Sequence, residues 1–265
     1  MRHPLYLRYL SISVKGQLQY KASFILQSIG QLFVSGLEFL GLWALFDRFG
    51  NLKGWTLPEA AFFYGLVNVS FAIADAMARG FDVFGSFVKS GEFDRLLLRP
   101  RSTVLQLAGH ELTLRRLGRL AQGLAVFVWA VTMLQLDISI VTFMLLCLAI
   151  AGTVALFIGL VIMQAGICFW TTESLEIMNI LTYGGVQTAQ YPISVYRKLF
   201  RRFFMFVVPL GSVCYFPAVR IIGKVDPLGF PGFFAWISPI GGLLFLLIAL
   251  LFWRFAQRRY TSTGS

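Results

Sequence analysis

Charged side chains are scarce in this sequence. Only 13% of its 265 residues are charged and 57% are hydrophobic, whereas about a quarter of the residues are charged in a typical soluble domain. This composition excludes a water-soluble domain and predicts helices that lie in a bilayer. Six spans of about 20 residues each would use roughly 120 residues, which leaves no room for a fused nucleotide-binding domain.

The motifs of common active sites are also missing. The sequence has no G-x-x-x-x-G-K-[ST], H-E-x-x-H or G-x-S-x-G segment, and its three cysteines form no C-x-x-C pair. Of its two histidines, His3 and His110, neither is predicted to act as a catalytic base. We therefore expect no enzyme active site, no metal site and no cofactor bound by this chain.

The apolar runs predict an all-α membrane protein with six transmembrane helices. A capping box at Thr56-Leu-Pro-Glu59 marks the start of the second span, and the short turn at 137–139 predicts a hairpin of the third and fourth. A basic amphipathic segment at 1–22 predicts an interfacial helix. The predicted spans are 23–46, 57–78, 117–136, 140–163, a fifth within 164–223, and 236–253, followed by a polar tail at 254–265.

Two models fit the fifth span. In the first, the span is 174–190, and residues 191–218 form short helices that dip into the outer half of the membrane. In the second, the span is 203–222, and the basic cluster at 197–202 is cytoplasmic. Prolines 209 and 217 disfavour a straight helix through 203–222, because each removes a backbone hydrogen bond that lipid cannot replace. We prefer the first model.

Basic residues indicate the orientation of the chain. The segment before the first span, the 79–119 loop and the tail together carry 15 Lys and Arg, against 3 in the opposite loops, or 7 if the 197–202 cluster lies there too. The positive-inside rule places both termini and the 79–119 loop in the cytoplasm. Because these residues follow the ends of apolar runs and do not form one water-exposed face, we expect no nucleic-acid partner.

Glu38 and Asp75 are acidic residues within predicted spans, where burial of a carboxylate is costly. Glu38 can line a substrate path, pair with a basic residue or stay protonated against a neighbouring helix, and a transport role and a packing role are about equally supported. Asp75 lies one turn before Arg79, which predicts an i,i+4 ion pair.

The loop segment GEFDRLLLRPRS, residues 91–102, predicts a short helix that begins at a glycine and ends at a proline. Phe93, Leu96, Leu97 and Leu98 give it an apolar side beside charges of both signs. Such a helix suits docking into a groove on another protein, and equally suits lying on the inner membrane surface among anionic lipids.

This segment, the YPISVY and VVPLGSVCYFPA stretches at 191–196 and 207–218, and the RRYTSTGS terminus together resemble the bacterial permease subunits of ABC-2 type transporters. The resemblance covers essentially the whole chain. It implies one permease domain over 1–265 in the bacterial plasma membrane, a second permease that is identical or related, and two copies of a cytoplasmic ATPase, which alone binds ATP and Mg²⁺.

The resemblance also implies a coupling helix in the 79–119 loop that seats on the ATPase, and a re-entrant outer segment after the fifth span. Substrate would pass between the two permeases, where the first span places Gln27, Gln31 and Glu38. An apolar path favours lipid-like or amphipathic cargo, exported by rocking of the two halves. The coupling positions it implies are Glu92, Phe93, Asp94, Arg95, Leu96, Leu97, Leu98, Arg99 and Pro100.

Two other classes of function compete with this interpretation. An ion-coupled secondary carrier would use Glu38 and Asp75, but such carriers often contain inverted repeats, and none is evident between 23–136 and 140–253. A membrane enzyme that acts on lipid would need histidines or carboxylates clustered at the membrane boundary, and none is visible in the sequence.

Overall fold

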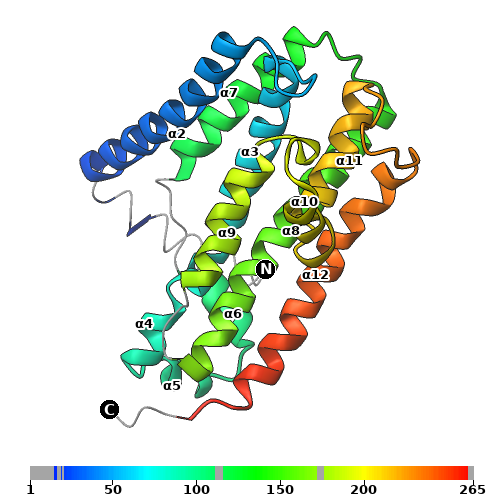
Figure 1. Cartoon of the computed structure of the whole chain (residues 1–265). Coiled ribbons are helices and arrows are strands. Elements are labelled where there is room, and N and C mark those ends of the chain that lie inside the picture. The colour runs from blue at the N-terminus through cyan, green and yellow to red at the C-terminus, as the bar shows by residue number, and fades with distance from the viewer. Residues whose placement is uncertain (1–14, 17–18, 20, 111–115, 172–175, 262–265) are drawn as a thin grey trace.

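The computed structural model describes residues 15–16, 19, 21–110, 116–171 and 176–261, and these are mainly helical. The predicted interfacial helix at 1–22 lies mostly outside the described residues. The helices pack into one bundle (Figure 1). They are α2 Lys21–Phe49, α3 Leu57–Asp82, α4 Phe84–Lys89, α5 Glu92–Leu97, α6 Thr103–Ala108, α7 Leu117–Met133, α8 Ile140–Thr171, α9 Glu176–Ala189, η2 Ile193–Val195, α10 Lys198–Arg202, η3 Phe203–Val207, α11 Leu210–Ile222 and α12 Phe234–Gln257.

Among the described residues, four helices are long and apolar enough to cross a membrane: α2, α3 with α4, α8 and α12. A fifth is reached if the bent pair Lys198–Val207 and Leu210–Ile222 counts as one span. The other two predicted spans correspond to the shorter helices α7, of 17 residues, and α9, of 14 residues. An all-helical membrane protein with four or five apolar spans is thus confirmed, and the count of six stays a prediction.

Helix α3 forms the centre of the bundle. It begins at Leu57, as the capping box predicts, and the Thr56 N–H donates to a Glu59 carboxylate oxygen at 2.8 Å. Helix α7 packs mainly on α3, whereas α8 packs mainly on α12 and also on α3, so the predicted hairpin of the third and fourth spans is wrong as a packed pair. A short turn joins α7 to α8, but each of them makes its larger contact with another helix.

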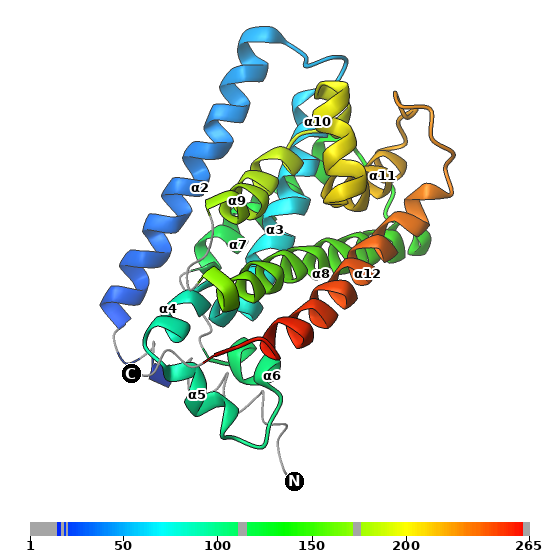
Figure 2. The same ribbon diagram turned by 60° about the horizontal axis from the view of Figure 1, so that its bottom comes forward.

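Helices α8 and α12 run side by side in both views (Figures 1 and 2) and pack in parallel through glycines. Gly152, Gly159 and Gly166 recur every seven residues along α8, which places them on one face. A Cβ atom added to Gly242 of α12 would lie 2.0 Å from the Gly152 carbonyl oxygen. The two backbones therefore touch, and a side chain at either glycine would push the helices apart.

Residues 193–222 (η2, α10, η3 and α11) form a bent segment whose two ends lie at the same end of the bundle, and we call it the re-entrant segment. Near its start, the Val195 carbonyl accepts from Lys53 Nζ at 2.8 Å; just after its end, Lys224 Nζ pairs with Glu59 at 2.7 Å. Both ends of the segment thus lie beside the loop before α3. The chain turns by 96° between Val207 and Leu210, so the straight helix over 203–222 of the second model is absent.

The bundle has two ends. The α5 end carries α4, α5, α6 and the end of α12, which gather at the bottom of both views (Figures 1 and 2). The opposite end carries the loops 50–56, 190–196 and 223–233. Asp226 organises the last of these loops: it accepts from the Tyr215 hydroxyl at 2.8 Å and from the N–H groups of Leu228 and Phe230 at 3.0 and 3.1 Å.

Candidate functional site

The predicted docking segment forms a short helix at the α5 end. Gly91 adopts a left-handed conformation with φ of 69°, which glycine enters at little cost, and the chain turns there from α4 into α5. Helix α5 spans Glu92–Leu97, with Glu92 and Asp94 in its first turn, where acidic side chains favour the helix dipole.

One face of α5 is buried within its own chain. Phe93 is 0% exposed, and its ring lies 5.0 Å from Phe84, 5.3 Å from Phe169 and 5.0 Å from Tyr260, measured between ring centroids. Leu96 is also buried. These contacts seat α5 against α4, α8 and the residues that follow α12.

Polar contacts close the same junction. Gln106 Nε2 of α6 donates to the carbonyls of Leu96 and Arg101 at 3.2 and 3.1 Å. Thr103 at the start of α6 accepts from Trp253 Nε1 at 3.2 Å and donates to Gln257 Oε1 at 3.0 Å, and both of these residues belong to α12. Helices α5, α6 and α12 therefore meet as one unit.

The apolar side of α5 was expected to face a partner or the inner membrane surface, but Phe93 and Leu96 on that side are buried within this chain. A six-residue helix is stable only when its apolar face packs on something, and the nearest apolar surface belongs to the same chain. Leu97 is 40% exposed and Leu98 is 85% exposed. Of the predicted coupling positions, the exposed ones are Glu92, Arg95, Leu97, Leu98, Arg99 and Pro100, while Asp94 is half-buried.

A hollow of about 410 Å³ lies next to this exposed face. Leu97, Arg101 and Arg254 contribute to its wall, together with Ser102 and Gln257. The α5 end thus combines a raised apolar pair, Leu97 and Leu98, with a hollow that has basic residues in its wall.

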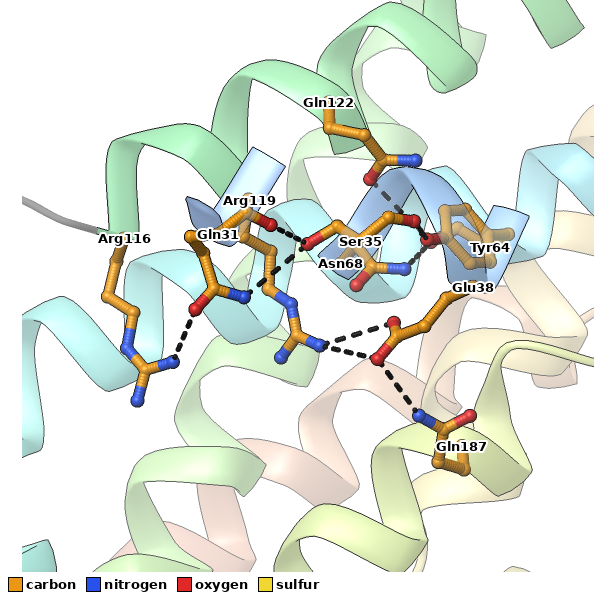
Figure 3. Close-up of polar contacts among 9 residues, drawn as sticks. All are labelled: Gln31, Ser35, Glu38, Tyr64, Asn68, Arg116, Arg119, Gln122 and Gln187. Carbon is orange, nitrogen blue, oxygen red and sulfur yellow. Dashed lines mark hydrogen bonds and ion pairs between the residues drawn. The ribbon is translucent and has the colours of Figure 1, made fainter. Parts of the chain in front are cut away.

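Polar residues of α2 form a second candidate site together with polar residues of neighbouring helices. We call this group the polar cluster, and its members are Gln31, Ser35, Glu38, Tyr64, Asn68, Arg116, Arg119, Gln122 and Gln187 (Figure 3). Arg119 Nη2 of α7 lies 3.3 Å from both carboxylate oxygens of Glu38. Gln187 Nε2 of α9 donates to the same carboxylate at 3.5 Å. Of the three roles considered for Glu38, pairing with a basic residue is the one the structure contains.

The expected ion pair between Asp75 and Arg79 is wrong. Asp75 pairs with Arg116, the residue directly before α7, and Arg79 pairs with Asp82 on its own helix. Arg116 also donates to Gln31 Oε1 at 3.5 Å. The i,i+4 rule considers one helix alone, whereas in this bundle an arginine on a packed neighbour is the closer partner.

The remaining members of the cluster join α2 to α3. The Tyr64 hydroxyl lies 2.8 Å from the Ser35 carbonyl oxygen, to which it donates, and 3.4 Å from Gln122 Oε1. Asn68 Nδ2 donates to the Tyr64 carbonyl at 2.9 Å. Beside them Gly118 lets α7 approach α2 closely, since an added Cβ atom would lie 2.2 Å from the Ser28 carbonyl oxygen.

Sequence reasoning found part of this cluster. Gln31 and Glu38 belong to it, whereas the exposed Gln27 bonds Ser23 of its own helix at 3.1 Å. Arg116, Arg119 and Gln122 were missed, because the first two were counted with the cytoplasmic loop. Their spacing of three residues, which places them on one face of a helix, was the available signal.

The contacts of the cluster position helices relative to one another. Each of its charged groups faces an opposite charge. Within the described part of the chain, no group of three or more His, Cys, Asp or Glu residues could hold a metal ion. Its chemistry is that of polar contacts between helices, which attach α2 to α3, α7 and α9.

Comparison with known proteins gives one family. A family model described as "ABC-2 family transporter protein" matches residues 32–264. No curated protein and no solved structure matches the chain.

Proposed function

Because the chain belongs to the ABC-2 transporter family, we propose that it is a permease subunit of an ATP-driven exporter in the bacterial plasma membrane. Family membership makes it the membrane component of an ABC transporter, which is not itself catalytic. In our proposal it works with two copies of a cytoplasmic ATPase and with a second permease, identical or related. ATP and Mg²⁺ bind to the ATPase.

The observation that carries this proposal is the two-sided construction of α5. Its buried face is fixed to α4, α8 and the end of α12 through Phe93. Its exposed face presents Leu98 and the charged residues Glu92, Arg95 and Arg99. A helix that is fixed to its own bundle and open to solvent on the other side is suited to receive a force from a partner, which is the role we assign to it.

The sidedness of the chain follows from the same assignment. Arg79, Arg116 and Arg119 lie in ion pairs within the bundle, and without these three the count of Lys and Arg on the α5 side falls from 15 to 12. This still exceeds the 7 that the opposite side carries when the 197–202 cluster is included. We therefore place the α5 end and both termini in the cytoplasm.

We place the second permease and the substrate path beside α2. Its apolar side chains remain largely exposed, for example Phe33 and Leu37 at 66% and 65%. On the inner side of the same helix Gln31 and Glu38 provide polar groups, and Gln27 is exposed. A path with such walls suits lipid-like or amphipathic cargo more than a small ion.

Closure of the ATPase dimer on ATP would displace α5, and α8 and α12 would move with it because they share the Phe93 contacts. The two permeases would then rock between inward-open and outward-open states. An ion-coupled carrier is less well supported. Its best residue, Glu38, is neutralised by Arg119 at 3.3 Å and so offers no free carboxylate to a cation.

The test is copurification of the soluble ATPase with the tagged chain. Leu98→Glu places a charge on the exposed face of α5, and we expect it to reduce the recovered ATPase about tenfold or more, the size of a loss at a central interface residue. Val225→Glu is the matched control, since Val225 is 89% exposed at the opposite end and Leu98 is 85% exposed.

Both variants should remain folded, because neither side chain packs in the bundle. Equal recovery of ATPase with both variants would contradict the assignment of α5. Transport that continues after ATP depletion and follows a proton or sodium gradient would replace the proposal by the carrier.

A further inference from the structure

An apolar hollow of about 760 Å³ lies between α9 and the α10–η3 part of the re-entrant segment. Thr188 is the single polar side chain in its wall, and its hydroxyl donates to the Gly184 carbonyl at 2.8 Å. The wall therefore provides apolar contacts to a ligand and few polar ones. Its residues are Ile180, Leu181, Gly184, Thr188, Leu199, Phe200, Phe203 and Phe204.

A dense group of positive charges borders this hollow. Arg197, Lys198 and Arg202 are exposed and Arg201 is half-buried. Within the described part of the chain, none of the four takes part in an ion pair. The group lies in a segment whose two ends are held at the opposite end of the bundle, where the positive-inside rule predicts few basic residues.

The charges and the hollow share the same short stretch of chain. Leu199, Phe200 and Phe203 line the hollow and are interspersed with the basic residues over 197–203. Each of these three lining residues has a basic residue as its direct neighbour in the chain, so the segment that forms this wall of the hollow also carries the charges. The site thus joins a long apolar contact to a compact positive charge.

We propose that this groove binds one anionic phospholipid, with an acyl chain in the hollow and its phosphate on Arg197, Lys198 and Arg202. Charge complementarity selects this occupant. A zwitterionic lipid would fill the hollow but leave the cations uncompensated, and a free phosphate would leave the hollow empty. The lipid belongs to the leaflet at the opposite end of the bundle. The inference goes beyond the proposed function, because binding needs no ATPase.

Native mass spectrometry of the whole chain in detergent tests this directly. The probes are dioleoyl phosphatidylglycerol, which is anionic, and dioleoyl phosphatidylcholine, which carries no net charge. We expect the wild-type chain to bind phosphatidylglycerol roughly tenfold more tightly or better, given three cations near the phosphate. Glycerol 3-phosphate, which has the phosphate but no chains, should not displace the bound lipid.

Two variants divide the site into its parts. The triple variant R197Q/K198Q/R202Q should lose the preference for phosphatidylglycerol, while R254Q/R258Q/R259Q, which removes three exposed charges from the α5 end, should keep it. Gly184→Leu should weaken both lipids equally, because it fills the hollow; an added Cβ atom there meets its nearest neighbour, Ile180 Cγ2, at 3.7 Å, so the helix tolerates the change.

Equal binding of the two lipids by the wild-type chain would overturn the proposal. So would equal losses in the two triple variants, displacement by glycerol 3-phosphate, or unchanged binding in Gly184→Leu. Dimers of the chain that carry no lipid would assign the groove to a second copy.

Discussion

The α8–α12 pair and the α2–α7 pair are both helix interfaces in this bundle, and they are held in different ways. Helices α8 and α12 touch through their backbones at Gly152 and Gly242, and aromatic rings fill the spaces beside Gly159 and Gly166. Such an interface gains its stability from close contact along its whole length.

Helix α2 is held by polar groups along its first part and by apolar side chains near its end. One close approach exists at Gly118, and polar contacts run through Glu38, Gln31 and Ser35. Nearer the C-terminal end of the helix, Leu42 and Phe46 are buried in the core and Phe39 packs on Tyr64 and Trp129. Much of its apolar surface is exposed, and it lies on the outside of the bundle alongside α7 (Figures 1 and 2). Helices α8 and α12 therefore form a rigid pair, whereas α2 is fixed at separate points along its length and presents an exposed apolar surface.

The largest expected effect concerns the contact of α5 with the rigid pair. Phe93→Ala removes a fully buried ring from between Phe84, Phe169 and Tyr260, and we expect it to lower the free energy of unfolding by about 3–5 kcal/mol. Thermal unfolding in detergent measures the change. Leu97→Ala, at an exposed position of the same helix, should have little effect. Similar losses in both variants would contradict the seated arrangement of α5.

A neighbouring pair of glycines probes the rigid interface itself. Gly242→Ala forces a Cβ atom against the Gly152 carbonyl, so we expect a loss of about 2–3 kcal/mol. Gly241→Ala meets Val213 at 3.8 Å, an ordinary contact, and should be neutral or stabilising by a few tenths of a kcal/mol. Unfolding of both variants in the same detergent decides the matter, and equal stability would show that α8 and α12 are not in backbone contact.

The smallest effect is expected at the polar interface. Glu38→Gln, Arg119→Gln and the double variant form a cycle, from which we expect a coupling free energy of about 1–2 kcal/mol. This is less than a fully buried pair would give, because the Glu38 side chain keeps 24% of its exposure. Gln27→Ala, on the same helix but outside the polar cluster, is the control. A coupling near zero would mean that other contacts hold α2.

Local patterns predicted the elements of this fold well. The start of α3, the beginning of α5 after Gly91 and the re-entrant segment follow from a capping box, a glycine and two prolines. Each of these signals acts within a few residues, so it can be read directly from the sequence.

The tertiary partners could not be predicted in the same way. Phe93 and Leu96 lie on an amphipathic helix, but the sequence does not say whose apolar surface covers them. Asp75 has Arg79 one turn away and nevertheless pairs with Arg116, which follows 41 positions later in the chain. The partner of each side chain depends on which helices become neighbours in the bundle. The spacing of residues along one helix carries no information about its neighbours.

The parallel packing of α8 and α12 links the two faces of the membrane. Phe169, beside α5, and Gly152, near the other end of α8, are separated by about 26 Å of continuous helix at 1.5 Å per residue. Helix α11 of the re-entrant segment packs on both α8 and α12. A displacement of α8 and α12 at the α5 end is therefore carried to the opposite end through backbones in direct contact. We expect α5 and α11 to move at the same time.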